Sequence, residues 1–149
     1  MFEDWPKLSS QKKLKKVVLI FIIAFGLNFL WENLHAGLYL HYQGQTITQL
    51  ILIRAAIFDA LFITALFWLI VALNSTRKNL WLWMLTISLL FAITLEVYAL
   101  QTDRWTYQKL MPIVPWFKTG LTPTVQLAIT ALISLWAVSQ KRKKEKTSG

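Results

Sequence analysis

The sequence lacks cysteine entirely, which excludes disulfides, thiol chemistry and cysteine-ligated metal sites. It also lacks internal repeats, low-complexity segments and any polar stretch long enough for a separate soluble domain. No motif for a cofactor or for an activated nucleophile is present, so we expect no cofactor. The sequence leaves open whether the protein is an enzyme.

Acidic residues are scarce, with 7 Asp and Glu against 16 Lys and Arg, and the net charge is +9. Many of the basic residues fall in two runs, KKLKK at 12–16 and KRKKEK at 141–146, each next to a long apolar stretch. Such runs typically contact anionic lipid head groups and fix membrane topology. Nucleic-acid binding is not expected, because no basic face with interleaved aromatics lies outside the apolar segments.

Hydrophobic residues, in contrast, are abundant: they make up 56% of the chain, and the mean hydropathy is +0.47. A helix needs roughly 20 apolar residues to cross a bilayer. Four stretches qualify, at about 17–40, 50–73, 80–100 and 121–139. We therefore predict an all-α polytopic integral membrane protein, a bundle of four transmembrane helices. It forms a single membrane domain over 17–140, between a basic N-terminal segment (1–16) and a basic tail (141–149).

The distribution of Lys and Arg predicts the orientation of these spans. Twelve of the 16 precede the first span, join the second to the third, or follow the fourth. Cytoplasmic loops are enriched in these residues. We therefore expect both termini in the cytoplasm, with the protein in a bacterial or archaeal plasma (inner) membrane.

Polar residues interrupt all four spans at a similar depth, in the half nearer the extracytoplasmic side. On the first span Asn28, Glu32, His35 and Tyr39 are spaced 4, 3 and 4 apart, so on a helix they share one stripe. Asn33 lies off that stripe. The other spans contribute Arg54 and Asp59, Glu96, and Gln126.

Charged side chains are costly in hydrocarbon, so we expect this polar layer to face inward around a pocket open to the extracytoplasmic side. Its three carboxyls, Glu32, Asp59 and Glu96, outnumber the one fixed cation, Arg54. Arg54 is expected to be a structural counter-ion and Gln126 an interhelical hydrogen-bond donor. The remaining carboxyls favour a proton or a bound cation, as acid–base chemistry requires.

The longest loop, 102–120, contains Arg104, Trp105 and Tyr107 and then the apolar run LMPIVPWF. So much apolar and aromatic surface is not expected in a freely solvated loop, and we predict that it folds back over the pocket or lies in the membrane interface. Trp31 is expected near the same interface. His41, in the preceding loop, is expected to be solvated.

The pair Glu32-x-x-His35 has the spacing at which helical bundles offer a carboxylate and an imidazole to a metal on one face. Di-iron carboxylate bundles need a second such pair, which this sequence lacks. We therefore expect no metal.

Our first hypothesis is a pocket that binds or transforms an amphipathic, lipid-like molecule by acid–base chemistry. The catalytic candidates are Glu32, His35, Asp59 and Glu96. The binding candidates are Asn28, Trp31, Asn33, Tyr39, Arg54, Arg104, Trp105, Tyr107 and Gln126. Two alternatives stay open: proton or cation translocation through the same carboxyls, and a non-catalytic accessory or assembly subunit whose polar layer is structural. The expected partners are the lipid bilayer and its anionic head groups, with a second membrane protein or a homo-oligomer as further options.

Overall fold

The computed structural model describes residues 8–73 and 76–147, and within them the chain is mainly helical. The helices are α1 (Ser10–His35), α2 (Gln49–Ala72), α3 (Arg77–Gln101) and α4 (Leu121–Thr147). Each contains a stretch long and apolar enough to cross a membrane, which confirms that part of the prediction. Residues 1–7 and 148–149 of the two basic terminal segments lie outside the described residues.

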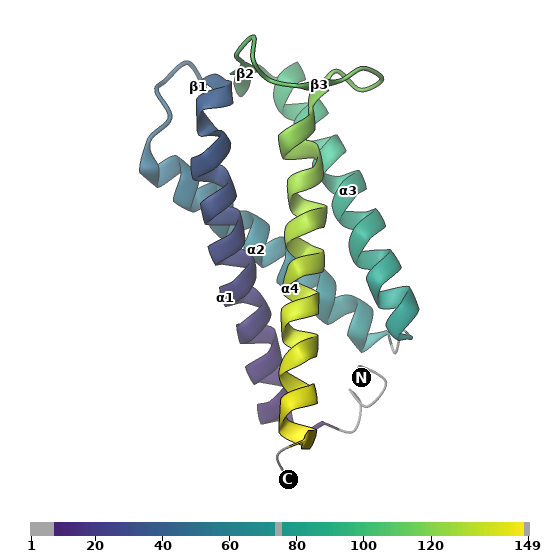
Figure 1. Cartoon of the computed structure of the whole chain (residues 1–149). Helices are drawn as coiled ribbons and strands as arrows, with labels where there is room; N and C mark the ends of the chain where they lie inside the picture. Colours follow the sequence, from purple (N-terminus) through teal and green to yellow (C-terminus); the bar gives the residue numbers. More distant parts are fainter. Residues whose placement is uncertain (1–7, 74–75, 148–149) are drawn as a thin grey trace.

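The four helices form one elongated bundle (Figure 1). We call the end where α1 begins and α4 ends the terminal end, and the opposite end the strand end. α1 packs against α2 and α4, and α3 packs mainly against α4. α2 runs obliquely behind the others, so it lies close to α3 at the terminal end and away from it at the strand end (Figure 1). This divergence makes room for a cavity at the strand end.

The first helix is shorter at its end than predicted. α1 stops at His35, a 3₁₀ turn spans Ala36–Leu38, and strand β1 covers Tyr39–Tyr42. The prediction that Tyr39 shares the helical stripe was therefore wrong. Gly37 is a poor helix former, and the sequence Tyr-Leu-His-Tyr suits a half-buried strand.

The loop 102–120 contains short strands that the sequence did not predict. β2 (Trp105–Tyr107) pairs antiparallel with β1, in the register Tyr39 with Tyr107 and Tyr42 with Trp105. β3 (Ile113–Val114) pairs with β4 (Thr119–Gly120), which leads directly into α4. The two loops at the strand end therefore form a small β layer over the helices.

The fourth predicted span, 121–139, agrees with the apolar part of α4, and the helix continues beyond it through the basic run to Thr147. Lys, Arg and Glu are good helix formers, and cations near a helix C-terminus complement its dipole.

The interior changes character along the bundle. Toward the terminal end it is filled by apolar side chains that are almost fully buried: Ile20, Ile63, Phe67, Leu80, Met84 and Leu135. Toward the strand end the buried residues include Asn28, His35, Glu96 and Gln126. Many leucines on the outer faces are exposed, among them Leu34 at 76% and Leu90 at 64%. An apolar exterior around a partly polar interior suits a hydrocarbon environment.

Candidate functional site

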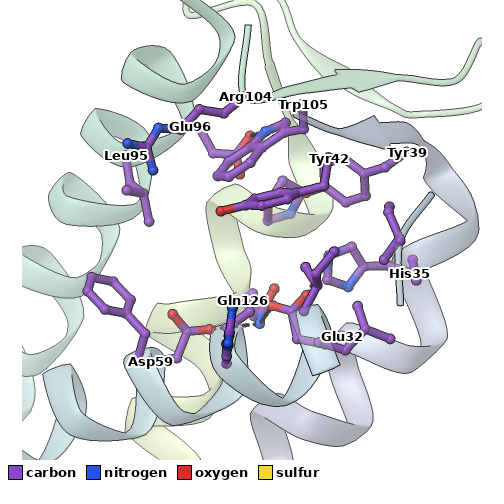
Figure 2. A pocket seen from close by; sticks show the side chains of 18 of the residues that line it. Glu32, His35, Tyr39, Tyr42, Asp59, Leu95, Glu96, Arg104, Trp105 and Gln126 are labelled. Atoms are coloured by element: carbon purple, nitrogen blue, oxygen red, sulfur yellow. Dashed lines mark hydrogen bonds and ion pairs between the residues drawn. The ribbon is translucent and has the colours of Figure 1, made fainter. Parts of the chain in front are cut away.

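A cavity of about 370 Å³ lies at the strand end, lined by all four helices and by β1 and β2 (Figure 2). Its polar lining consists of Glu32, His35, His41, Tyr39, Tyr42, Arg54, Asp59, Glu96, Arg104, Trp105 and Gln126. Its apolar lining consists of Ile47, Ile51, Leu52, Ala55, Phe58, Ala92, Leu95 and Leu127, with Ala36 and Pro123. The cavity thus brings together the four catalytic candidates and five of the nine binding candidates.

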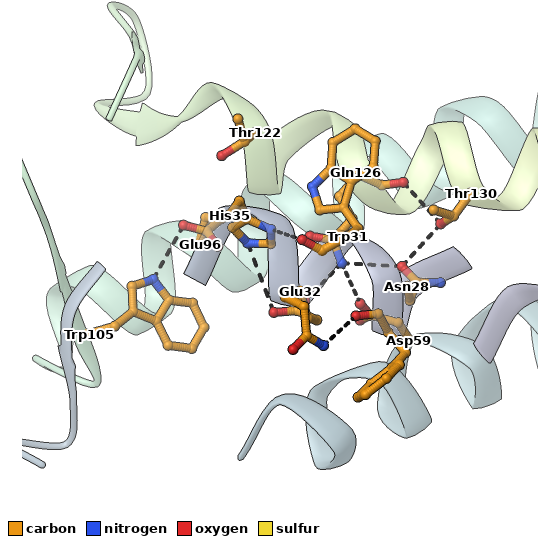
Figure 3. Close-up of polar contacts among 12 residues, drawn as sticks. Asn28, Trp31, Glu32, His35, Asp59, Glu96, Trp105, Thr122, Gln126 and Thr130 are labelled. Atoms are coloured by element: carbon orange, nitrogen blue, oxygen red, sulfur yellow. Dashed lines mark hydrogen bonds and ion pairs between the residues drawn. The ribbon is translucent and has the colours of Figure 1, made fainter. Parts of the chain in front are cut away.

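Gln126 of α4 is the centre of the polar contacts. Its Nε2 lies 2.8 Å from Glu32 Oε1, 3.1 Å from Asp59 Oδ2 and 3.2 Å from Asn28 Oδ1 (Figure 3). An amide nitrogen carries two hydrogens, so it cannot satisfy three acceptors fully. Acceptors from α1 and α2 therefore converge on one donor of α4, and the cluster holds more acceptor oxygens than this donor can satisfy.

The pair formed by Glu32 and His35 lies on the last turn of α1. His35 Nδ1 is 2.7 Å from the carbonyl oxygen of Trp31, and a carbonyl can only accept, so Nδ1 carries the hydrogen. This leaves Nε2 directed at Glu32 Oε2, at 3.9 Å. An imidazole nitrogen facing a carboxyl oxygen forms an acid–base pair at the cavity wall.

Glu96 of α3 is held from the β layer. Trp105 Nε1 donates to Glu96 Oε2 over 3.3 Å, and the Tyr107 hydroxyl donates to the same oxygen. The amide of Gly120 donates to the Tyr107 oxygen over 2.8 Å. Within residues 8–73 and 76–147, no donor reaches Glu96 Oε1. One oxygen of this carboxyl is fixed and the other stays available.

Two tyrosines of the β layer keep their protons over a wide range of pH. Burial raises the pKa of the Tyr107 hydroxyl, and the neighbouring Glu96 carboxyl raises it further. Burial also raises the pKa of Tyr39 well above its usual value. Tyr107 therefore remains a hydrogen-bond donor to Glu96 at physiological pH.

The two arginines at the cavity do not neutralise the carboxyls. Arg54 and Arg104 both line it but are exposed. For the described carboxyls of the cavity, the ion-pair contact is that of His35 with Glu32. The guanidinium carbon of Arg104 lies 5.4 Å from the centroid of the Tyr98 ring. The expected role of Arg54 as a counter-ion paired with a carboxylate was wrong, because its long side chain lies at the exposed rim.

Four predicted binding residues lie outside the cavity lining. Asn28 is fully buried below it and accepts from Gln126 and from the Thr130 hydroxyl. Trp31 offers its carbonyl to His35. Asn33 is exposed and accepts from Gln49 on α2. Tyr107 stands behind Glu96. These residues support the site rather than face its interior.

Sequence reasoning missed several lining residues. His41 was expected to be solvated, but it is half-buried, lines the cavity and accepts from the Gly44 amide over 3.2 Å. Tyr42 also lines the cavity and stacks on Trp105, with ring centroids 6.2 Å apart. The apolar wall from α2 was missed as well. The sequence could have predicted this wall, because Leu52, Ala55 and Asp59 are spaced 3 and 4 apart and so share one helical face.

The described residues contain no group of three or more His, Asp or Glu side chains arranged to hold a metal ion. Comparison of the chain with protein-family models, with curated proteins and with solved structures finds no match. The function is therefore argued from the site itself.

Proposed function

We propose that this chain is an integral membrane protein that binds an amphipathic, lipid-like small molecule in the cavity at the strand end. In this proposal both termini are cytoplasmic, and the cavity lies in the extracytoplasmic half of a bacterial or archaeal plasma membrane. The observation that carries it is the cavity's composition: about 370 Å³ with one apolar and one polar wall. This volume falls within the range of small-molecule sites.

The apolar wall would receive the hydrocarbon part of the ligand. It is formed mainly by α2, and Leu95 of α3 also lines the cavity. Phe58 lines the cavity and is 48% exposed, so it stands between the cavity and the outer face of the bundle. Toward the terminal end, Phe91 stacks on Phe58 and on Phe62, with ring centroids 6.1 and 4.1 Å apart. These rings join α2 to α3 below the cavity, which supports an approach from the bilayer beside Phe58.

The polar wall would act on the ligand's head group. His35 Nε2 and Glu32 Oε2, 3.9 Å apart, are both groups that can bind or release a proton, and Glu96 lines the same cavity. Paired acid–base groups beside a buried ligand are the arrangement that proton transfer requires. We propose that Glu32 and His35 exchange a proton with the bound molecule, with Gln126 and Glu96 fixing its position.

The polar contacts below the cavity favour a closed site over a path for ions. The Ser134 hydroxyl donates to a carbonyl of its own helix over 2.7 Å, and the single Thr130 hydroxyl hydrogen lies between Asn28 Oδ1 at 3.1 Å and the Gln126 carbonyl at 2.9 Å. Beyond them the bundle interior is the apolar core of Phe67, Met84 and Leu135. Translocation needs a continuous series of exchanging groups, and backbone carbonyls do not carry protons onward.

The test is identification of what the protein retains when purified in mild detergent. We expect native mass spectrometry to detect a specific bound molecule on the wild type, and expect Glu32→Gln and Glu96→Gln to reduce its occupancy several-fold. Asp103→Asn is the matched control, because Asp103 is an exposed carboxylate at the same end that does not line the cavity. Its φ of 55° suits asparagine.

Thermal unfolding of the same four proteins separates a binding site from a structural network. A site that holds carboxyls for a ligand should keep or gain stability when one is neutralised. If both cavity variants lose stability and all four proteins retain the same mixture of lipids, the polar layer is structural and the proposed function is wrong.

A further inference from the structure

Three hydrogen-bond donors beside the cavity carboxyls are already used by other protein groups, whereas the Tyr42 hydroxyl stays available. Gln126 Nε2 faces three acceptor oxygens, and Trp105 Nε1 donates to Glu96. His35 Nδ1 donates to a backbone carbonyl. Around the carboxyls, acceptor oxygens remain available: within the described chain, no donor reaches Glu96 Oε1 or Asp59 Oδ1. A ligand that complements this wall has to bring a donor or a positive charge.

Glu96 is the most constrained of these acceptors. Its side chain is only 5% exposed, it lines the cavity, and two donors hold its other oxygen in place. A buried carboxyl with an available oxygen and no cation within ion-pair distance, among the described residues, lacks compensation for its charge. A cationic group in the cavity would supply that compensation.

Aromatic rings form the roof over the same carboxyl. Tyr42 and Trp105 stack with an interplanar angle of 24°, and Tyr39 meets Trp105 edge-on at 86° with centroids 6.1 Å apart. Figure 2 shows the Tyr42 hydroxyl directed into the cavity below the Trp105 ring, on the side that faces Glu96. Electron-rich ring faces beside a carboxylate attract alkylammonium groups, which are cations with an apolar surface.

We infer that the bound molecule carries an organic ammonium group on a hydrocarbon body, with the nitrogen held by Glu96 under the rings of Tyr42 and Trp105. This rests on the proposed ligand-binding function and names its ligand class. The body lies along the apolar wall of α2, and Glu32, His35 and Asp59 form the floor on the other side of the nitrogen. The two cations that line the cavity, Arg54 and Arg104, lie at its exposed rim.

The test uses three synthetic probes that share one arylalkyl body and end in trimethylammonium, in its neutral isostere tert-butyl, or in carboxylate. Saturable binding is measured with the purified protein in nanodiscs of zwitterionic lipid. We expect the ammonium probe to bind the wild type about tenfold more tightly than the tert-butyl probe, the scale of a desolvated cation–aromatic contact. Glu96→Gln and Tyr42→Leu should remove that preference and leave binding of the tert-butyl probe unchanged. Asp103→Asn should behave as the wild type.

The remaining outcomes overturn either the cationic ligand or the binding function itself. Equal affinity for the ammonium and tert-butyl probes rejects the cationic ligand while the binding function stands. Tightest binding of the carboxylate probe, lost in Arg54→Gln, places an anion at the rim instead. If no probe shows saturable binding, the proposed function falls together with the inference. Tyr42→Leu leaves all three carboxyls and their donors intact. This variant therefore tests the preference for the ammonium probe even if Glu96→Gln does not fold.

Discussion

Tyr107 connects a buried carboxyl to the backbone of a distant loop through a single hydroxyl. It accepts from the Gly120 amide, which precedes α4, and donates to Glu96 on α3. The donor Trp105 reaches the same carboxyl oxygen from two residues earlier. The orientation of Glu96 in the cavity therefore depends on a residue that does not itself line the cavity.

Tyr107→Phe should destabilise the protein while leaving its packing intact. The change removes a donor to Glu96 and leaves the Gly120 amide without its acceptor, and leaving such groups unsatisfied costs about 1–3 kcal/mol. Thermal unfolding in detergent should show a midpoint lower by roughly 2–4 °C per kcal/mol for a chain of this size. The control is Tyr98→Phe, since Tyr98 is 50% exposed and its ring contacts Arg104. Equal midpoints for the two variants would show that the Tyr107 hydroxyl contributes nothing.

Individual cavity residues differed in how far the sequence could predict them. Glu32, Asp59 and Glu96 were predictable as inward-facing, because a carboxyl in an apolar span has few alternatives to an interior position. Arg54 was not, since a long side chain with a terminal charge can extend to a polar rim. His41 was missed because its position depends on the pairing of β1 with β2, which no local pattern specifies.

At the level of elements, the pairing of β1 with β2 gives the cavity its aromatic roof. The strands belong to loops that are far apart in the sequence and that each looked irregular. Their alternation was too short for periodicity to indicate strands. A bulge between Tyr39 and His41 shifts the register, so Leu40 has no partner in β2.

This register can be tested directly because the chain has no cysteine of its own. His41 and Thr106 are partners, and facing Cα atoms in antiparallel strands lie about 4.5–5.5 Å apart, within the range of a disulfide. We expect the double variant His41→Cys, Thr106→Cys to form an internal disulfide on mild oxidation, seen as a reductant-sensitive shift in gel mobility. The pair Leu40→Cys, Thr106→Cys should not. Cross-linking of the second pair alone would mean that the register is offset by one residue.

The junction of β4 with α4 is closely packed around a glycine. A Cβ at Gly120 would lie 2.9 Å from Met111 Sδ and 3.0 Å from Pro123 Cγ. Methionine can move aside, but the proline ring belongs to the first turn of α4 and cannot.

Gly120→Ala should therefore destabilise the protein, by about 1–3 kcal/mol as expected for overpacking. Gly26→Ala is the matched change in α1, where an added Cβ meets no atom within 4 Å. It should be neutral or stabilising by up to about 1 kcal/mol, because alanine favours the helix. Thermal unfolding of both variants measures the contrast. A Gly120→Ala protein as stable as Gly26→Ala would show that the junction is loosely packed.

For the whole molecule, the number of spans and the bounds of the last three were predictable, whereas the ends of the first span and the extension of α4 beyond its span were not. Bilayer thickness sets the length of an apolar run, so four runs predicted four helices. Helix ends follow backbone propensity and tertiary pairing instead. α1 therefore begins at Ser10, before its apolar run, and α4 continues through the basic segment to Thr147. The cavity itself depends on the oblique course of α2, which hydropathy does not encode.

The distribution of charged and apolar side chains bears on the side of the membrane to which the cavity opens. The basic segments flank the terminal end, where α1 begins and α4 ends (Figure 1). The strand end instead carries exposed apolar side chains, with Trp116 at 86% and Leu110 at 81% exposure. A cytoplasmic excess of Lys and Arg would place the terminal end inside and the cavity outside.

Single cysteines report this orientation because the chain has none to interfere. Lys109, in the loop before β3, and Ser10, at the start of α1, are both exposed. We expect a membrane-impermeant maleimide to label Lys109→Cys in intact cells, provided that any outer envelope is permeable to it, and to label Ser10→Cys only after the membrane is disrupted. Denatured samples control for the total thiol present. The reverse pattern would open the cavity to the cytoplasm, so its ligand would have to come from the inner leaflet.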